Sequence, residues 1–233
     1  MASTLHRFSR ATLPVTPWKN GGGTTQEIAC WPPGAGLDAF DWRVSIARIE
    51  TSGAFSTFPG VERSIVLLDG GGGGGGDGEA DGVWLRSADG RIDHRLAHPL
   101  EPFAFSGDAE VHAVLLGGAT SDFNVMARRA RGLAEVRVLA RSDTLAPAPA
   151  GLVMCLRGHW SFDGQRFDPG EGAWWTAGAP AGALHAGSRD ARLIAVRWLP
   201  KPPPPPSDSG GAGTTGSAVA AHRGNSMTQE QRP

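Results

Sequence analysis

Hydrogen-bond donors gather near the start of the chain, in the stretch WKNGGGTTQE. The protein has only two lysines and three asparagines among its 233 residues, and this stretch holds one of each side by side. Three glycines follow, and glycine allows the backbone to approach a ligand more closely than other residues do. An ammonium, a carboxamide and backbone amides together suit a carboxylate or a phosphate. We therefore expect an anion to bind at Lys19, Asn20, Gly21, Gly22, Gly23 and Thr24.

A second group of polar residues lies in three segments that are predicted to be strands. Side chains alternate along a strand, so residues two apart in one segment share a face. One arginine of this group, Arg63, lies at the start of an apolar run, where a buried charge is costly unless it has a partner. Taken singly, the arginines fit surface salt bridges and the asparagine fits a turn cap. Taken together, we interpret them as a second part of the same anion site: Arg43, Ser45, Arg63, Asn124, Met126 and Arg128.

Other kinds of reactive site find less support in the sequence. His94 and His98 are four residues apart, which on a strand separates them by about 13 Å, too far for one metal ion. No G-x-S-x-G motif marks a nucleophilic serine, and neither cysteine stands in a cationic setting that would activate it. We expect no metal, no cofactor and no catalytic residue. The alternative is a general base at Glu27 or Glu62.

The bulk composition limits the partners and the location. Basic and acidic residues number 22 and 23, so the net charge of −1 gives no electrostatic footprint for nucleic acid or an anionic membrane. The chain has no apolar leader segment and no apolar run of about 18 residues. Two cysteines cannot form a disulfide framework. We expect a cytoplasmic protein that binds a small anionic ligand and forms a homodimer.

The central part of the chain alternates short apolar segments with turns. Predicted strands include 42–49, 64–69, 102–106 and 192–198, and turns such as SADG and DPGEG separate the strands. No long 3.6-residue periodicity is present, so the pattern favours an all-β sandwich or barrel. A faint internal repeat is typical of two copies of one barrel. The end of the chain, 201–233, is rich in proline, glycine and serine and is predicted to be disordered.

Five separated motifs resemble the HutD/Ves family of cupin-like proteins. They are PWKNGGGTTQEI, DWRVSIARIETSGAFSTFPGVER, LLDG, PFAFSGD and DFNVMARR, and the resemblance covers nearly all of 10–200. It implies a bicupin: two antiparallel β-barrels of the RmlC-like jelly-roll type in one compact unit with little helix. The expected parts are a first barrel at 1–120, a second barrel at 121–200 and a tail at 201–233. Gln26, where the family often has arginine, and the glycine run 70–76, a predicted flexible insertion, depart from the family pattern.

In the metal-binding cupin pattern, six residues separate a glutamate from the glycine that follows it. Here Arg63 is followed by six residues and then Gly70, and the pattern's histidine positions fall among 56–59, which hold no histidine. A cation in place of the glutamate would repel a metal and attract an anion. The resemblance thus implies a metal-free carboxylate site that regulates histidine utilisation by binding an intermediate such as formylglutamate or urocanate, or a role in stress responses. The alternative is a metal-independent isomerase or hydrolase.

Overall fold

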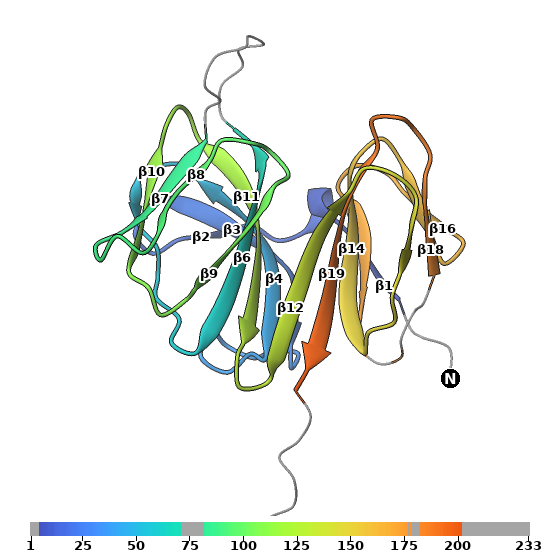
Figure 1. The fold of residues 1–233 in the computed structure, drawn as a ribbon, viewed down its shortest axis with the longest axis horizontal. Coiled ribbons are helices and arrows are strands. Elements are labelled where there is room, and N and C mark those ends of the chain that lie inside the picture. Colours follow the sequence, from blue (N-terminus) through green and yellow to red (C-terminus); the bar gives the residue numbers. More distant parts are fainter. Residues whose placement is uncertain (1–4, 71–81, 177, 179–181, 202–233) are drawn as a thin grey trace, which may run out of the picture. The chain divides into compact units, whose positions relative to one another are not determined.

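The computed structural model describes residues 5–70, 82–176, 178 and 182–201. These residues form nineteen strands, β1 to β19, and a single 3-10 turn, η1 (Arg10–Thr12), which confirms the all-β prediction (Figure 1). The predicted disordered tail and most of the predicted glycine insertion lie outside the described residues. No helix among the described residues is long and apolar enough to cross a membrane.

The first barrel is built from two antiparallel sheets. Its six-stranded sheet has the order β2 (Thr16–Pro17), β3 (Gly23–Trp31), β4 (Trp42–Ile49), β11 (Thr120–Arg128), β6 (Val61–Asp69) and β9 (Pro102–Ser106). Its four-stranded sheet has the order β5 (Gly53–Ala54), β10 (Val111–Leu115), β7 (Val83–Ser87) and β8 (Asp93–Leu96). Neighbouring strands are thus often distant in the sequence, which is typical of a jelly roll.

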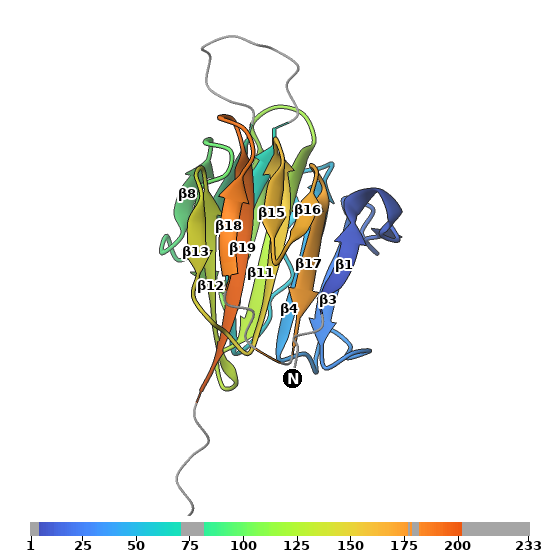
Figure 2. The same ribbon diagram turned by 90° about the vertical axis from the view of Figure 1, so that its right-hand side faces the viewer.

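The second barrel has the same plan. Its five-stranded sheet has the order β1 (His6–Ser9), β17 (Glu171–Trp175), β14 (Ala150–Arg157), β19 (Arg192–Pro200) and β12 (Gly132–Leu139). Its four-stranded sheet has the order β13 (Asp143–Leu145), β18 (Gly182–Ala186), β15 (Trp160–Phe162) and β16 (Gln165–Phe167) (Figure 2). Two antiparallel barrels in one chain confirm the bicupin prediction.

The strand pairing corrects the predicted division at residue 120 in two places. β11 starts at Thr120, but it pairs with β4 and β6 along its whole length and so belongs to the first barrel. β1 lies at the start of the chain, but it pairs with β17 and so completes the second barrel. The chain therefore enters the second barrel, builds the first from residue 16 to 128, and returns. Backbone hydrogen bonds between strands, rather than position in the sequence, decide these memberships.

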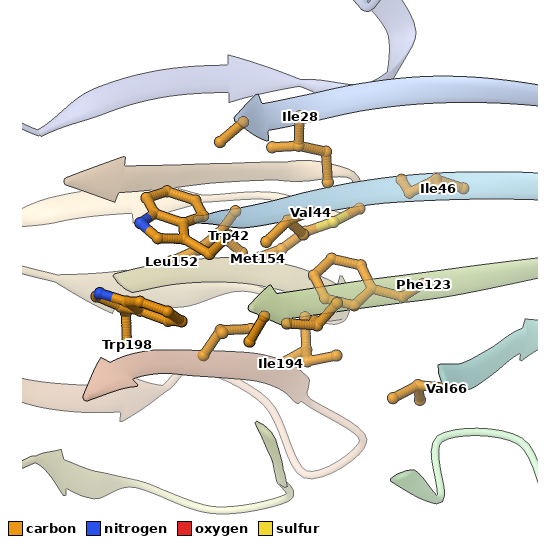
Figure 3. Packing of buried hydrophobic residues seen from close by; sticks show 14 of the residues in the cluster. Ile28, Trp42, Val44, Ile46, Val66, Phe123, Leu152, Met154, Ile194 and Trp198 are labelled. Atoms are coloured by element: carbon orange, nitrogen blue, oxygen red, sulfur yellow. The ribbon is translucent and has the colours of Figure 1, made fainter. Parts of the chain in front are cut away.

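Three apolar cores hold the barrels together. One fills the first barrel and includes Ile65, Leu85 and Phe105, and one fills the second barrel and includes Trp160 and Trp175. The third lies between the two larger sheets, with side chains from β3, β4, β6 and β11 on one side and from β14 and β19 on the other (Figure 3). Each fully buried large apolar side chain stabilises the fold by roughly 1.5–3 kcal/mol relative to exposure, so this third core joins the barrels into one unit.

Alternation along β4 shows how the sequence builds both a core and a site. Trp42, Val44 and Ile46 point toward the second barrel and join the core between the sheets. Arg43 and Ser45 lie on the other face, inside the first barrel. β19 has apolar residues on both faces because the second barrel covers one face and the first barrel covers the other. This explains why its sequence is apolar without alternation.

Candidate ligand-binding site

The polar residues of the first barrel converge at one level of its six-stranded sheet. Arg63 on β6 lies opposite Met126 on β11, which in turn lies opposite Arg43 on β4. One step along the same face, Asn124 lies opposite Ser45. The register therefore brings together five of the residues predicted from the sequence, all on the inner face of the barrel.

Arg63 is a buried cation within an aromatic surround. It is only 6% exposed, and its guanidinium carbon lies 5.1 Å, 5.6 Å and 4.9 Å from the ring centres of Phe55, Phe58 and Phe105. Such contacts with ring faces are each worth about 0.5–2 kcal/mol. They offset part of the desolvation cost of the charge but leave its hydrogen-bonding groups unsatisfied.

No carboxylate pairs with Arg63 among the residues that the structure describes. Its Nη2 donates a long hydrogen bond of 3.5 Å to Asn124 Oδ1, and its buried Nε has no partner within the described part of the chain. Burial, with the positive charge of Arg43 as a second cause, lowers the pKa of Arg63 to about 10. The guanidinium therefore remains charged at neutral pH and is available to an anion.

Arg43 does have a carboxylate partner. Its Nε donates to Glu27 Oε2 at 2.7 Å, and its Nη1 lies 3.5 Å from Ser45 Oγ. The side chain of Arg43 is 12% exposed and that of Glu27 is 49% exposed, so this pair forms the open side of the site. A bulge between Glu27 and Ala29 interrupts the pairing of β3 with β4. Bulges re-aim side chains, and here one shifts the register of β3 directly beside Glu27.

The predicted glycine stretch lies elsewhere in the barrel. Gly23 pairs with Ile49, six residues along β4 from Arg43, a span of about 20 Å in an extended strand. Lys19, Asn20 and Gly21 are exposed there. The structure therefore does not bring this stretch together with Arg63, and its predicted role at the mouth of the same site is not supported by the geometry.

The glycine stretch has a structural role instead. Asn20 Oδ1 accepts a hydrogen bond from the Gly22 amide at 3.0 Å, and the Gly22 carbonyl accepts from the amides of Glu50 and Thr51. A Cβ on Gly23 would lie 2.1 Å from the carbonyl oxygen of Arg48, so only glycine fits. The three glycines and Asn20 thus shape a tight turn against the end of β4.

Two other predicted residues also lie outside the cluster. Thr24 pairs with Arg48 and lies on the opposite face from Thr25, whose hydroxyl accepts a hydrogen bond from the Trp18 indole at 2.7 Å. Arg128 donates to the backbone carbonyls of Asp38 and Phe40 at 2.8 Å and 3.1 Å. Its guanidinium anchors the β3–β4 loop.

Met126 closes the barrel below the two arginines. It is fully buried and packs in a small apolar cluster with Phe40, Val61 and Phe58. Within this cluster, the guanidinium of Arg63 lies over the ring of Phe58 and that of Arg128 lies over the ring of Phe40. Met126 therefore shapes the site by packing rather than by donating a hydrogen bond.

The two candidate general bases differ in position. Glu27 lies in the site beside Arg43. Glu62 neighbours Arg63 on β6, so it faces the other side of the sheet, where its carboxylate lies 3.5 Å from Arg129. Only Glu27 therefore lies where it could act on a ligand held by Arg63.

Sequence reasoning missed a buried acid in the same barrel. Asp122 is 0% exposed, and its Oδ2 accepts a hydrogen bond from Thr120 at 3.1 Å, while Oδ1 has no partner within the described residues. Its pKa is raised to about 7, chiefly by desolvation and to a smaller extent by the charge of Asp69, while the Thr120 hydrogen bond acts in the opposite direction. Asp122 shares its strand face with Asn124, so the alternation used for Asn124 and Met126 could have found it.

A separate cleft lies on the other face of the six-stranded sheet. It has a volume of about 560 Å³ and is lined by Arg10, Gln26, Asp69, Met154 and Arg157 among others. Two of its polar side chains are engaged: Gln26 donates to the carbonyls of Arg10 and Leu13, and Arg10 donates to Ser121. No group of three His, Cys, Asp or Glu side chains among the described residues is placed to hold a metal ion. We therefore place the candidate site at Arg63, where a buried charge lacks a partner.

Comparison with known proteins supports this description of the chain. The family model described as HutD matches residues 10–193. The chain belongs to the HutD family. Curated relatives named Protein Ves agree with this: the protein of Cronobacter sakazakii is 39% identical over 173 residues, covering 74% of this chain and 87% of the relative. The Escherichia fergusonii protein is 37% identical over 197 residues, covering 84% and 96%.

Similar solved structures have the same fold. A conserved protein of unknown function from Pseudomonas aeruginosa is 33% identical with a TM-score of 0.71, covering 84% of this chain and 100% of that one. HutD from Pseudomonas fluorescens, solved in a formate condition, is 27% identical with a TM-score of 0.70, covering 85% and 100%. An oxalate decarboxylase from Lactobacillus farciminis, 10% identical with a TM-score of 0.55, shares the fold alone, over 86% of this chain and 88% of that one.

Proposed function

We propose that this HutD-family bicupin binds a small carboxylate inside its first barrel without the help of a metal ion. One observation carries the proposal: Arg63 is a buried guanidinium for which the described residues supply no carboxylate. Buried arginines are normally paired, because an isolated buried charge is costly. A ligand carboxylate would supply the missing partner through a charge-assisted hydrogen bond, with bidentate geometry within reach of a planar guanidinium.

The neighbouring groups suit the same ligand. Arg43 adds a second positive charge close enough to lower the pKa of Arg63. Asn124 and Ser45 add a carboxamide and a hydroxyl on the same inner face. An anion entering the site would relieve the repulsion between the two cations. The site thus favours an anion over a neutral or cationic ligand by general electrostatic complementarity.

Family membership suggests a biological setting. The relative from Pseudomonas fluorescens carries the name HutD and was solved in a formate condition, which fits a site for carboxylates. We propose that this chain limits flux in histidine utilisation by binding an intermediate such as formylglutamate, as a regulatory protein rather than an enzyme. A stress-response role is the corresponding proposal if its function follows the relatives named Ves.

A second candidate function rests on Glu27. This half-exposed carboxylate lies 2.7 Å from Arg43 at the open side of the site, where it could accept a proton from a bound ligand. The alternative is therefore a metal-independent isomerase or hydrolase with Glu27 as general base. Turnover of a bound carboxylate that disappears in Glu27→Gln, while binding persists, would establish this alternative.

Isothermal titration calorimetry with formate, formylglutamate and urocanate tests the proposal. We expect saturable binding of at least one of these anions to the native protein, with a stoichiometry of one per chain. The matched control is Arg128→Met, which removes an arginine outside the polar cluster and should leave binding unchanged. Absence of binding by every carboxylate would overturn the proposal. So would a loss of affinity in Arg128→Met equal to the loss in Arg63→Met.

A further inference from the structure

The charges directly beside Arg63 and Arg43 do not balance, although Asp122 adds a partly ionised carboxylate two steps farther along the sheet face. Among the described residues, Arg63, Arg43 and Glu27 are the charged groups at the level of the site. Glu27 pairs with Arg43 at 2.7 Å, which leaves the charge of Arg63 uncompensated. Counting one formal charge for each of the three side chains, the site has a net charge of about one positive unit.

We infer that Glu27 is a specificity-determining residue. Because of Glu27, the barrel prefers carboxylates with a single net negative charge. At the position where a dianion carries its second carboxylate, the preferred ligand carries an uncharged hydrogen-bond donor. The inference rests on the proposed carboxylate function of the site and narrows its ligand class: among the candidates named above, it favours the monoanions urocanate and formate over the dianion formylglutamate. The carboxylate of the ligand pairs with Arg63, and an amide or hydroxyl of the ligand donates to the carboxylate of Glu27.

The position of Glu27 explains this preference. A second ligand carboxylate could reach Arg43 only by displacing Glu27, because Glu27 already accepts the Nε–H hydrogen bond. If Glu27 stayed in place, two carboxylates would face each other in a partly desolvated site, and like charges there repel. A neutral donor meets neither obstacle. Glu27 is half exposed, so a ligand at the open side can reach its carboxylate.

Asp122 and His94 lie farther from this contact, and the nearby Cys30 thiol, opposite Arg43, is uncharged because burial raises its pKa. Asp122 lies opposite Ala47 and Leu67, two steps along the sheet face from Arg63, and it is fully buried beside Thr120. His94 stacks on Phe103 at a ring separation of 3.7 Å near the other edge of the barrel. Neither is paired with Arg43 or Arg63, so Glu27 is the acid that sets the charge of the site.

A pair of ligands of equal shape tests the inference. Glutarate carries two carboxylates, and glutaramate replaces one of them with an uncharged amide. We expect the native protein at pH 7.5 to bind glutaramate about two- to fivefold more tightly than glutarate, the range for a partly exposed charge contact. In Glu27→Gln the order should reverse, because Arg43 is then free to pair with the second carboxylate of glutarate.

The control variant is Glu62→Gln, which removes a carboxylate from the other face of β6. It should leave the native preference for glutaramate intact. Equal affinities for the two ligands in the native protein, or the same preference in native protein and Glu27→Gln, would overturn the inference while the carboxylate function stands. If neither ligand nor formate binds, the proposed function itself fails. A thermal melt of each variant shows that the comparison concerns folded protein.

Discussion

Replacing Arg63 by methionine tests whether this arginine exists to bind a ligand or to hold the fold. Methionine keeps much of the side-chain volume and the contact with Phe55, Phe58 and Phe105, and it removes the charge. We expect carboxylate affinity to fall about ten- to a hundredfold, since a charge-assisted hydrogen bond contributes roughly 1.5–3 kcal/mol. Arg63→Lys should recover only part of the loss, because an ammonium lacks the planar fork of the guanidinium.

The effect on stability follows from two opposing contributions. The lowering of the pKa of Arg63 to about 10 corresponds to a cost of roughly 3 kcal/mol for holding the charge in the barrel. Methionine removes this cost, but it also removes cation–π contacts worth about 0.5–2 kcal/mol each. These contributions are of similar size, so we expect the free energy of unfolding to change by less than about 2 kcal/mol.

Calorimetry and urea unfolding on the same preparation of Arg63→Met give both quantities. An arginine in a structural ion pair would behave differently, because loss of one buried partner costs about 3–5 kcal/mol without changing the affinity for an added anion. A strongly destabilised variant with native carboxylate affinity would refute the reasoning.

Three further predictions concern residues around the site. Burial raises the pKa of Asp122 to about 7, so between about pH 4 and pH 7 the folded protein holds a proton that the unfolded chain has lost. The free energy of unfolding should therefore fall by up to about 4 kcal/mol as the pH rises from about 4 to about 7. Asp122→Asn should flatten this pH dependence in urea unfolding at pH 5 and pH 8, and an unchanged slope would contradict the assignment. Gly23→Ala should lower the melting temperature strongly, because its Cβ would lie 2.1 Å from the Arg48 carbonyl oxygen. An unchanged melting temperature would show that the backbone of β4 can shift to accommodate the Cβ. Arg128→Met should destabilise the protein by about 1–3 kcal/mol through the lost backbone contacts while calorimetry shows native carboxylate affinity, and a large loss of affinity would place Arg128 in the site after all.

Alternation along single strands predicted much of the site. Arg43 and Ser45 share a face of β4, and Asn124 and Met126 share a face of β11, as the spacing of two residues requires. The same spacing indicates Asp122, which the sequence alone gave no reason to prefer over other acids. Its special position becomes visible only when the barrel closes over it and removes it from solvent.

Distances between strands could not be predicted in the same way. The stretch from Lys19 to Gly23 and the residue Arg63 both carry polar groups, but the register places Gly23 opposite Ile49, at the far end of β4 from Arg43. Likewise, the short segment His6–Ser9 has no sequence signal that would assign it to β17. Register and long-range pairing depend on the whole fold, so local patterns do not determine them.

The most direct test of the central claim is a crystal structure of the native protein grown with a saturating monocarboxylate such as formate. We predict carboxylate density inside the first barrel, with an oxygen within hydrogen-bond distance of the Arg63 guanidinium. Full-occupancy density only in the cleft lined by Arg10, Gln26 and Arg157, with the Arg63 guanidinium left without an anion, would contradict the account.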